Sequence, residues 1–314
     1  MKVFLAGSTG AIGRPLAAAL AASGHQVTGT TRSERGRVFL TGLGVTPVIL
    51  DALNAEAVQA AIKRASPDVV IDQLTALPTR YRRDELLIAF EPNRRLRIEG
   101  GANLLKAAEA AGVQRYIVQS GGFLAAPGVG LADESTPFAV DGPPGVAANA
   151  RMYEEIERRA TQSASLDAVI LRYGIFYGPG TWFNRDGDIV DQLRSRMFPI
   201  VGAGEGVWSF IHVEDAASAT VASINGAPGV YNIADDQPIA LRDWLPAFAD
   251  SVGAPRPGTI TEADALQAAG PEFVYYAMRL RGASNAKARG KLDFQPRRLP
   301  WLDAARTAGT RSDE

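Results

Sequence analysis

Three glycines near the start of the chain have the spacing that binds the pyrophosphate of a dinucleotide. They lie in Gly7-Ser8-Thr9-Gly10-Ala11-Ile12-Gly13, between a short apolar run and an alanine- and leucine-rich helical pattern. A turn at this place points backbone N–H groups and a helix N-terminus at the phosphates. Gly7 is expected to permit the turn, Gly10 the approach of the phosphates, and Gly13 close packing of the helix on the strand. The residues expected to contact the cofactor here are Gly7, Thr9, Gly10, Ala11, Ile12 and Gly13, and a purely structural turn is the alternative.

The end of the second apolar run bears on which dinucleotide is bound. It reads Thr30-Thr31-Arg32-Ser33, without the acidic residue that would bind the ribose 2′-hydroxyl of NAD. The guanidinium of Arg32 can instead hold a 2′-phosphate through a two-pronged hydrogen bond. The sequence therefore favours NADP, with NAD as the other candidate and an ordinary solvated arginine as the alternative reading.

Alternating apolar and helical stretches predict the elements that position these residues. The pattern is typical of an α/β fold, a doubly wound parallel sheet with crossover helices. Residues 1–172 and 207–234 are expected to form the dinucleotide-binding domain, and residues 173–206 and 235–314 a smaller discontinuous C-terminal lobe for the substrate. Strands are predicted at 2–6, 26–31, 46–50, 69–73, 115–120, 168–172, 208–213 and 230–233, and helices at 13–23, 55–65, 94–111 and 148–163, with a loop over the active site at 121–144.

Composition excludes several classes of function. The 314 residues carry a net charge of −1, so no overall field attracts nucleic acid or an anionic membrane. The chain has no cysteine and two histidines, which speaks against disulfides, thiolate chemistry and a metal site. With no apolar run of membrane length and a predicted strand at its start, a cytoplasmic protein acting on a small molecule is expected.

Further blocks follow the glycine turn in a fixed order. They include Leu-Arg-Tyr-Gly-Ile-Phe-Tyr-Gly-Pro-Gly at 171–180 and Phe-Ile-His-Val-Glu-Asp-Ala-Ala at 210–217, with others at 103–108, 231–234 and 284–288. With these blocks the chain resembles the extended short-chain dehydrogenase/reductase family, in its atypical epimerase/dehydratase-like branch. The resemblance implies a Rossmann fold with a nicotinamide cofactor, Asp51 at the adenine, and Leu74 and Thr75 along the cofactor groove. It also implies a homodimer that pairs through helices 94–111 and 148–163.

The usual catalytic residues of that family are absent. The resemblance implies a Tyr-x-x-x-Lys pair on the helix around 145–157, and a serine or threonine just after the fifth strand. In this chain the two helix places fall on Ala147 and Arg151, or on Val146 and Ala150 in the other register. The hydroxyl place falls on Gly121.

Three residues are candidates to take over the chemistry. Tyr153 lies on nearly the same helix face as Val146 and Ala150 and could reach the site, or it could simply pack in the core. Ser120 could hydrogen bond a substrate or only form a turn. Tyr173 could form a wall beside the nicotinamide. Arg151 could replace the lysine as a fixed charge, whereas the arginines at 80–97 are interpreted as a solvated helix face.

These observations predict an NADP-preferring oxidoreductase or epimerase. Hydride would pass to or from a small organic carbonyl or alcohol, without the usual tyrosine and lysine. A cofactor-binding sensor that has lost the chemistry is one alternative. A dehydratase or isomerase with no net redox change is the other.

Overall fold

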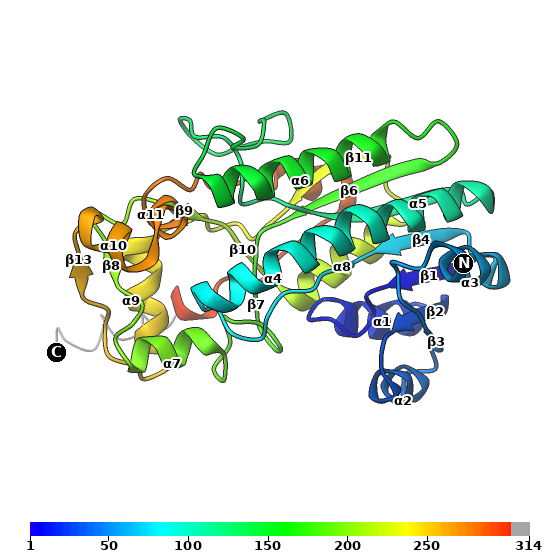
Figure 1. The fold of residues 1–314 in the computed structure, drawn as a ribbon, viewed down its shortest axis with the longest axis horizontal. Coiled ribbons are helices and arrows are strands. Elements are labelled where there is room, and N and C mark those ends of the chain that lie inside the picture. Colours follow the sequence, from blue (N-terminus) through cyan, green and yellow to red (C-terminus); the bar gives the residue numbers. More distant parts are fainter. Residues whose placement is uncertain (303–314) are drawn as a thin grey trace.

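The computed structural model describes residues 1–302, and its centre is a seven-stranded sheet (Figure 1). The strand order is β11-β6-β5-β4-β1-β2-β3, and every neighbouring pair is parallel. The predicted doubly wound α/β sheet is therefore confirmed. The strands are β1 (Lys2–Ala6), β2 (Gln26–Thr31), β3 (Thr46–Ile49), β4 (Val69–Asp72), β5 (Arg115–Gly121), β6 (Asp167–Tyr173) and β11 (Gly229–Ile233).

Helices cover both faces of this sheet, which is why its central strands are apolar on both sides. One layer holds α3 (Ala55–Ala65), α4 (Arg83–Arg95), α5 (Gly101–Ala110) and α6 (Pro144–Thr161). The other holds α1 (Gly13–Ala22), α2 (Glu34–Gly42), α8 (Val213–Ser223) and α12 (Ala286–Leu292). No helix within residues 1–302 is both long and apolar enough to cross a membrane.

A second lobe with an aromatic core lies beyond one end of the sheet (Figure 1). Trp244 is fully buried there, and its ring centroid lies 5.0 Å from that of Trp208 and 5.1 Å from that of Phe210. The residue boundaries of the two domains stay a prediction. The remaining elements are β7 (Ile175–Tyr177), α7 (Asp188–Arg194), β8 (Ile200–Val201), β9 (Val207–Trp208), β10 (Phe210–His212), β12 (Ile239–Ala240), α9 (Leu241–Ser251), β13 (Thr259–Ile260), α10 (Glu262–Ala269) and α11 (Pro271–Met278).

Three elements differ from the sequence prediction. The helix predicted at 94–111 begins at Arg83 and is interrupted by a π-helical turn, η1 (Leu96–Gly100). The strand predicted at 208–213 is divided between β9 and β10, and Val213 already begins α8. Helix α2 was not predicted, because its polar sequence shows little apolar periodicity; the Ser33 side chain caps it by accepting the N–H of Gly36 at 3.1 Å.

The loop predicted over the active site is held against the second lobe. It runs between the end of β5 and the start of α6. Ala132 accepts the N–H of Ser284 at 2.7 Å and donates its own N–H to Gly282 at 2.7 Å. Arg281 binds the carbonyls of Val129, Gly130 and Leu131. This loop is therefore fixed at its middle by the chain 150 residues further on.

Asp235 is a carboxyl buried directly after β11. Its side chain is 1% exposed; Oδ1 accepts the N–H of Gln237 at 2.8 Å, whereas Oδ2 has no hydrogen-bond partner within residues 1–302. Burial raises the pKa of Asp235 to about 7, and the carboxylates of Asp236 and Asp215 act in the same direction.

This carboxyl makes the free energy of unfolding depend on pH. The folded protein keeps the proton up to about pH 7, while the unfolded chain releases it near 3.8. Stability is therefore expected to fall as pH rises between these values, by about 4 kcal/mol at roughly 1.4 kcal/mol per pKa unit. Asp235→Asn should remove this loss and be more stable than the wild type at pH 8, but not at pH 4. Urea unfolding of both proteins at the two pH values measures the difference, and parallel pH profiles would contradict the assignment.

Candidate cofactor and catalytic site

Two of the three motif glycines are required by the fold itself. Gly7 has φ +78°, and a Cβ there would lie 2.5 Å from the carbonyl oxygen of Gln73. A Cβ on Gly13 would lie 2.0 Å from the carbonyl oxygen of Gly7. The predicted roles of Gly7 in the turn and of Gly13 in close helix packing are therefore confirmed.

Gly10 is different, because the protein leaves room for a side chain there. A Cβ on Gly10 would meet only the Gly7 oxygen, at 3.4 Å, and its φ is one that any residue can adopt. Helix α1 begins three residues later, without a side-chain cap on its first N–H groups. The glycine at this position is thus unexplained by packing, whereas a pyrophosphate lying against the turn explains it. The turn fits a dinucleotide.

Side-chain hydrogen bonds fix this turn to the neighbouring strand β2. Ser8 is fully buried and donates its hydroxyl to the carbonyl of Thr30 at 2.6 Å. The hydroxyl oxygen of Thr30 accepts the N–H of Gly7 at 3.2 Å. The Thr9 methyl lies 3.0 Å from where a Cβ on Gly36 would be, so the start of α2 approaches the turn.

Arg32 directly follows β2 and is exposed at the same sheet edge. Within residues 1–302 no hydrogen bond or ion pair uses its guanidinium, so it is available to an anion. A second cation, Arg14, lies nearby: its Nε donates to the Thr9 carbonyl at 3.1 Å and its guanidinium covers the Phe39 ring at 4.4 Å. Sequence reasoning missed Arg14, although its place directly after Gly13 was the available signal.

The other residues predicted to contact the cofactor follow strands of the same edge. Asp51 comes after β3, is exposed, and accepts the N–H of Leu53 at 3.0 Å. Leu74 and Thr75 come after β4; the N–H nitrogen of Leu74 is 3.3 Å from the Cβ position of Gly7. Because parallel strands end together, these residues line up beside the glycine turn. Their contact with a cofactor stays a prediction.

Tyr153 reaches the carboxyl end of β5 from helix α6. Its ring atoms would lie 2.7 and 2.8 Å from a Cβ on Gly121, and its hydroxyl 3.2 Å. The ring is parallel to Phe138, with 6.0 Å between centroids, and is 8% exposed as a residue. The hydroxyl has no hydrogen-bond partner in residues 1–302 and is not enclosed, so water reaches it. The Tyr153 phenol thus occupies the space that a side chain at position 121 would fill if this residue were not glycine.

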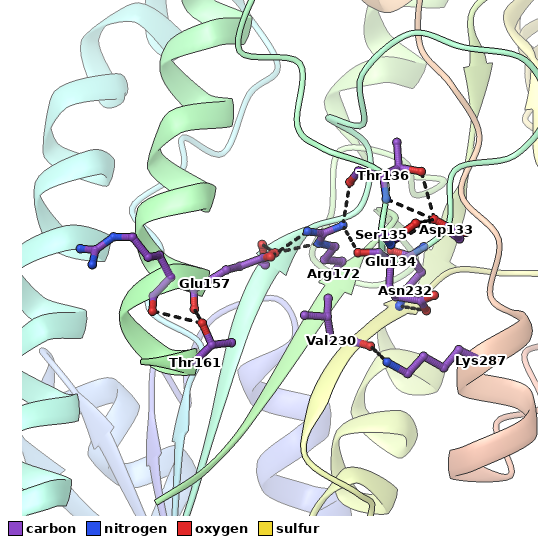
Figure 2. Close-up of polar contacts among 12 residues, drawn as sticks. Asp133, Glu134, Ser135, Thr136, Glu157, Thr161, Arg172, Val230, Asn232 and Lys287 are labelled. Atoms are coloured by element: carbon purple, nitrogen blue, oxygen red, sulfur yellow. Dashed lines mark hydrogen bonds and ion pairs between the residues drawn. The ribbon is translucent and has the colours of Figure 1, made fainter. Parts of the chain in front are cut away.

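Ser120 belongs to a buried network of hydrogen-bonded polar side chains. Its hydroxyl donates to Glu157 at 2.6 Å. Glu157 in turn accepts two hydrogen bonds from Arg172, both 2.8 Å (Figure 2). Figure 2 also shows Arg172 reaching the backbone carbonyls of Glu134 and Thr136. Ser120 gives its one proton to Glu157, so its proposed contact with substrate stays a prediction that these contacts do not favour.

A surface hollow of about 590 Å³ borders this ion pair. It is lined by α6 and by the segment preceding it, and no residue predicted to hold the cofactor contributes to its wall. Two ion pairs lie in its wall, Arg158 with Glu155 at 2.7 Å and Arg172 with Glu157 at 2.8 Å. The hollow is separate from the cofactor edge.

Tyr173 and Arg151 also have partners. Tyr173 is 1% exposed; its hydroxyl is 2.6 Å from that of Thr220 and accepts from Gln73 at 3.1 Å. Burial raises the pKa of Tyr173 well above its ordinary value. Arg151 donates to the Val140 carbonyl at 2.9 Å on the surface. The role of Tyr173 at the site stays a prediction, which its burial and its two hydroxyl contacts do not favour.

The arginine run at 80–97 contains one residue that is not solvated. Arg97 is 4% exposed and lies beneath the Tyr153 ring, with its guanidinium carbon 4.9 Å from the ring centroid. The interpretation of this run as a solvated face is therefore wrong for Arg97. The π-turn η1 points the side chain inward, and nothing in the local sequence distinguishes this arginine from its neighbours.

Comparisons with known proteins agree with this geometry. The family model described as NAD dependent epimerase/dehydratase family matches residues 3–234. A 3-diazoavenalumate denitrifying reductase from a Streptomyces species is 42% identical over 96% of this chain and 98% of its own. A Stigmatella aurantiaca ketoreductase of 4-hydroxy-2-methyl-3-oxo-4-farnesyl-3,4-dihydroquinoline-1-oxide is 26% identical over 81% of this chain and 74% of its own. Among solved structures, the dTDP-glucose 4,6-dehydratase of Streptomyces venezuelae shares the fold, with a TM-score of 0.75, 18% identity and coverage of 100% and 98%.

Proposed function

This chain belongs to the NAD dependent epimerase/dehydratase family, and we propose that it is an NADPH-dependent reductase of a small organic substrate. The observation that carries the proposal is Gly10, a position where the packing of the protein would accept a side chain but the sequence has none. The open first turn of α1 and the free Arg32 lie at the same edge. When bound there, the nicotinamide supplies a hydride. Both relatives described above are named as reductases, which supports reduction over sensing or isomerisation.

Three basic residues of the C-terminal segment are held by other parts of the protein. A diphosphate needs free cations, but Arg281 is bound to three loop carbonyls. Lys287 donates to the Val230 carbonyl at 2.7 Å and covers the Tyr231 ring, and Arg289 is paired with Asp236. These three cations are occupied, whereas Arg279 and Lys291 of the same segment are exposed and have no side-chain partner within residues 1–302, so only those two are available to a diphosphate.

Tyr153 is the residue that we propose as proton donor for a carbonyl substrate. Reduction of a carbonyl forms a C–H bond from hydride and an O–H bond from a proton. The Tyr153 hydroxyl is free of protein partners, reached by water, and placed at the end of β5. It can therefore give its proton to the substrate oxygen and recover one from solvent.

A diazo group is a second candidate acceptor of the hydride, because the 42% identical relative is named as a denitrifying reductase of a diazo compound. A diazonium carbon that takes up hydride forms a C–H bond, and its C–N bond breaks to release dinitrogen. No oxygen has to be protonated in this reaction. It therefore needs neither a tyrosine nor a lysine, which agrees with the absence of the usual pair from this chain.

Arg32 is expected to select NADPH over NADH. A charge-assisted pair with the 2′-phosphate contributes about 1.5–3 kcal/mol, so Arg32→Ala should weaken NADPH binding roughly 10- to 100-fold. NADH affinity should stay within about twofold of wild type, because NADH lacks that phosphate. Calorimetric titration with both nucleotides measures this, with Arg64→Ala on α3 as an exposed-arginine control. Equal losses for NADPH and NADH in Arg32→Ala would remove the proposed role.

The homodimer stays a prediction. Helix α4 carries two exposed apolar side chains, Leu87 at 65% and Ile88 at 77%. Helix α4 leads into the first of the two helices, 94–111 and 148–163, through which the resemblance implies dimerisation. A second copy of the chain would remove these two side chains from water.

A further inference from the structure

Arg97 is a buried cation without a carboxylate partner. Its Nη2 donates to the carbonyl of Gln119 at 2.8 Å, and its Nε is buried with no partner in the described chain. No Asp or Glu oxygen within residues 1–302 lies in ion-pair distance of its guanidinium. Burying a charge without a partner is unfavourable unless another group nearby interacts with that charge.

The nearby acid compensates this charge only in part. Asp72 interacts electrostatically with Arg97, but its Oδ1 accepts the N–H of Leu74 and its Oδ2 the hydroxyl of Tyr116. Burial raises the pKa of Asp72, whereas its two hydrogen bonds and the charges of Arg97 and Arg159 act in the opposite direction. Arg97 is therefore close enough to Asp72 to interact with it electrostatically, but no carboxylate within residues 1–302 is in direct ion-pair contact with its guanidinium.

The group that this charge faces is the Tyr153 ring. The guanidinium carbon lies 4.9 Å from the ring centroid, and Phe138 packs parallel to the ring with centroids 6.0 Å apart. Gly121 permits this placement, because any Cβ there would overlap the ring at 2.7 Å. Arg97 and Gly121 thus fix both the position and the electrostatic surroundings of the phenol. The π-turn that carries Arg97 is a rare feature, often found at functional sites.

We infer that Arg97 is a positioning residue that stabilises the Tyr153 phenolate, in place of the missing lysine. The inference rests on the proposed role of Tyr153. When Tyr153 gives its proton to a substrate oxygen, the O–H bond of the phenol breaks and its electron pair stays on Oη. The fixed guanidinium stabilises this negative charge, and water then returns a proton to Oη. Arg97 itself stays protonated throughout, since a guanidinium does not exchange protons at working pH.

The test compares Arg97→Gln, which keeps a hydrogen-bond donor but loses the charge, with Arg97→Lys, which keeps the charge. Arg159→Gln is the matched control: it removes a cation that binds the same π-turn through the carbonyls of Ile98 and Arg97, and that makes no cation–ring contact with Tyr153 within residues 1–302. The first readout needs no cofactor. N-acetylimidazole transfers its acetyl group to phenolate oxygen, and the rate at Tyr153 is followed by peptide mass spectrometry. The second readout is kcat and KM for reduction of a carbonyl with NADPH.

Arg97→Gln is expected to acetylate Tyr153 at least tenfold more slowly than wild type, and to lower kcat about 10- to 100-fold with little change in KM. Arg97→Lys should keep most of the acetylation rate and most of kcat, and Arg159→Gln should change neither of these two quantities. Acetylation of Arg97→Gln at the wild-type rate, or an equal loss in Arg159→Gln, would overturn the inference. If Arg97→Gln fails to fold by thermal unfolding, Arg97→Met replaces it, because methionine fills the site without a buried donor. If the wild type has no reductase activity, the proposed function is wrong. The acetylation rates would still show whether Arg97 stabilises the Tyr153 phenolate.

Discussion

Gly10→Ala is expected to fold as the wild type does and to bind NADPH at least about a hundredfold more weakly. The added methyl group meets no protein atom closer than 3.4 Å, so the free energy of unfolding should hardly change. The same methyl group would stand between the backbone N–H groups and the pyrophosphate. Losing two such charge-assisted hydrogen bonds, each about 1.5–3 kcal/mol, accounts for the weaker binding. Calorimetric titration with NADPH and urea unfolding measure the two effects.

Two other glycines give matched controls for this substitution. Gly13→Ala places a methyl group 2.0 Å from the Gly7 oxygen and should lower stability as well as binding. Gly42→Ala, at the end of α2, meets nothing within 4 Å and should change neither. Wild-type affinity for NADPH in Gly10→Ala would mean that the turn is only structural, and the proposed reductase would have no cofactor site.

Tyr153→Phe is expected to lower kcat for a carbonyl substrate by about 10²–10⁴-fold, the usual contribution of a general acid. The substitution removes only the hydroxyl, which makes no hydrogen bond to any part of the chain from 1 to 302. The ring contacts with Phe138 and Arg97 remain, so stability and NADPH affinity should stay unchanged. Steady-state reduction of carbonyl compounds, followed by nicotinamide absorbance, measures the effect.

The same variant separates the two candidate reactions. Reduction of a diazo compound needs no proton on oxygen, so its kcat should survive in Tyr153→Phe. Tyr231→Phe is the control, because that hydroxyl binds the Ala227 carbonyl far along the chain from the β5 edge. Full carbonyl reduction by Tyr153→Phe would exclude Tyr153 as the proton donor. Loss of diazo reduction in the same variant would instead place the phenol in substrate binding.

The predicted sheet and its cofactor edge follow from short-range patterns. Strands at 2–6 and 26–31 and the helix at 55–65 were predicted with the boundaries observed, because apolar runs and glycine turns are local signals. The same locality explains why Arg32, Asp51 and Leu74 lie where expected, each directly after a strand of the parallel sheet. The prediction missed α2, whose polar sequence shows little apolar periodicity. It also misplaced the helix around 94–111, because the π-turn interrupts the helical period there.

The sequence by itself determined the sheet, the glycine turn and the absence of the usual tyrosine and lysine, because each is decided by residues close together in the chain. Only the tertiary structure decided which side chains lie around the places of the missing pair. Ser120 meets Glu157 across 37 residues, and Tyr153 meets Gly121 and Arg97 from separate elements. Burial and charge depend on such distant partners, so one arginine of a polar run becomes a buried cation beneath a phenol while its neighbours stay in water.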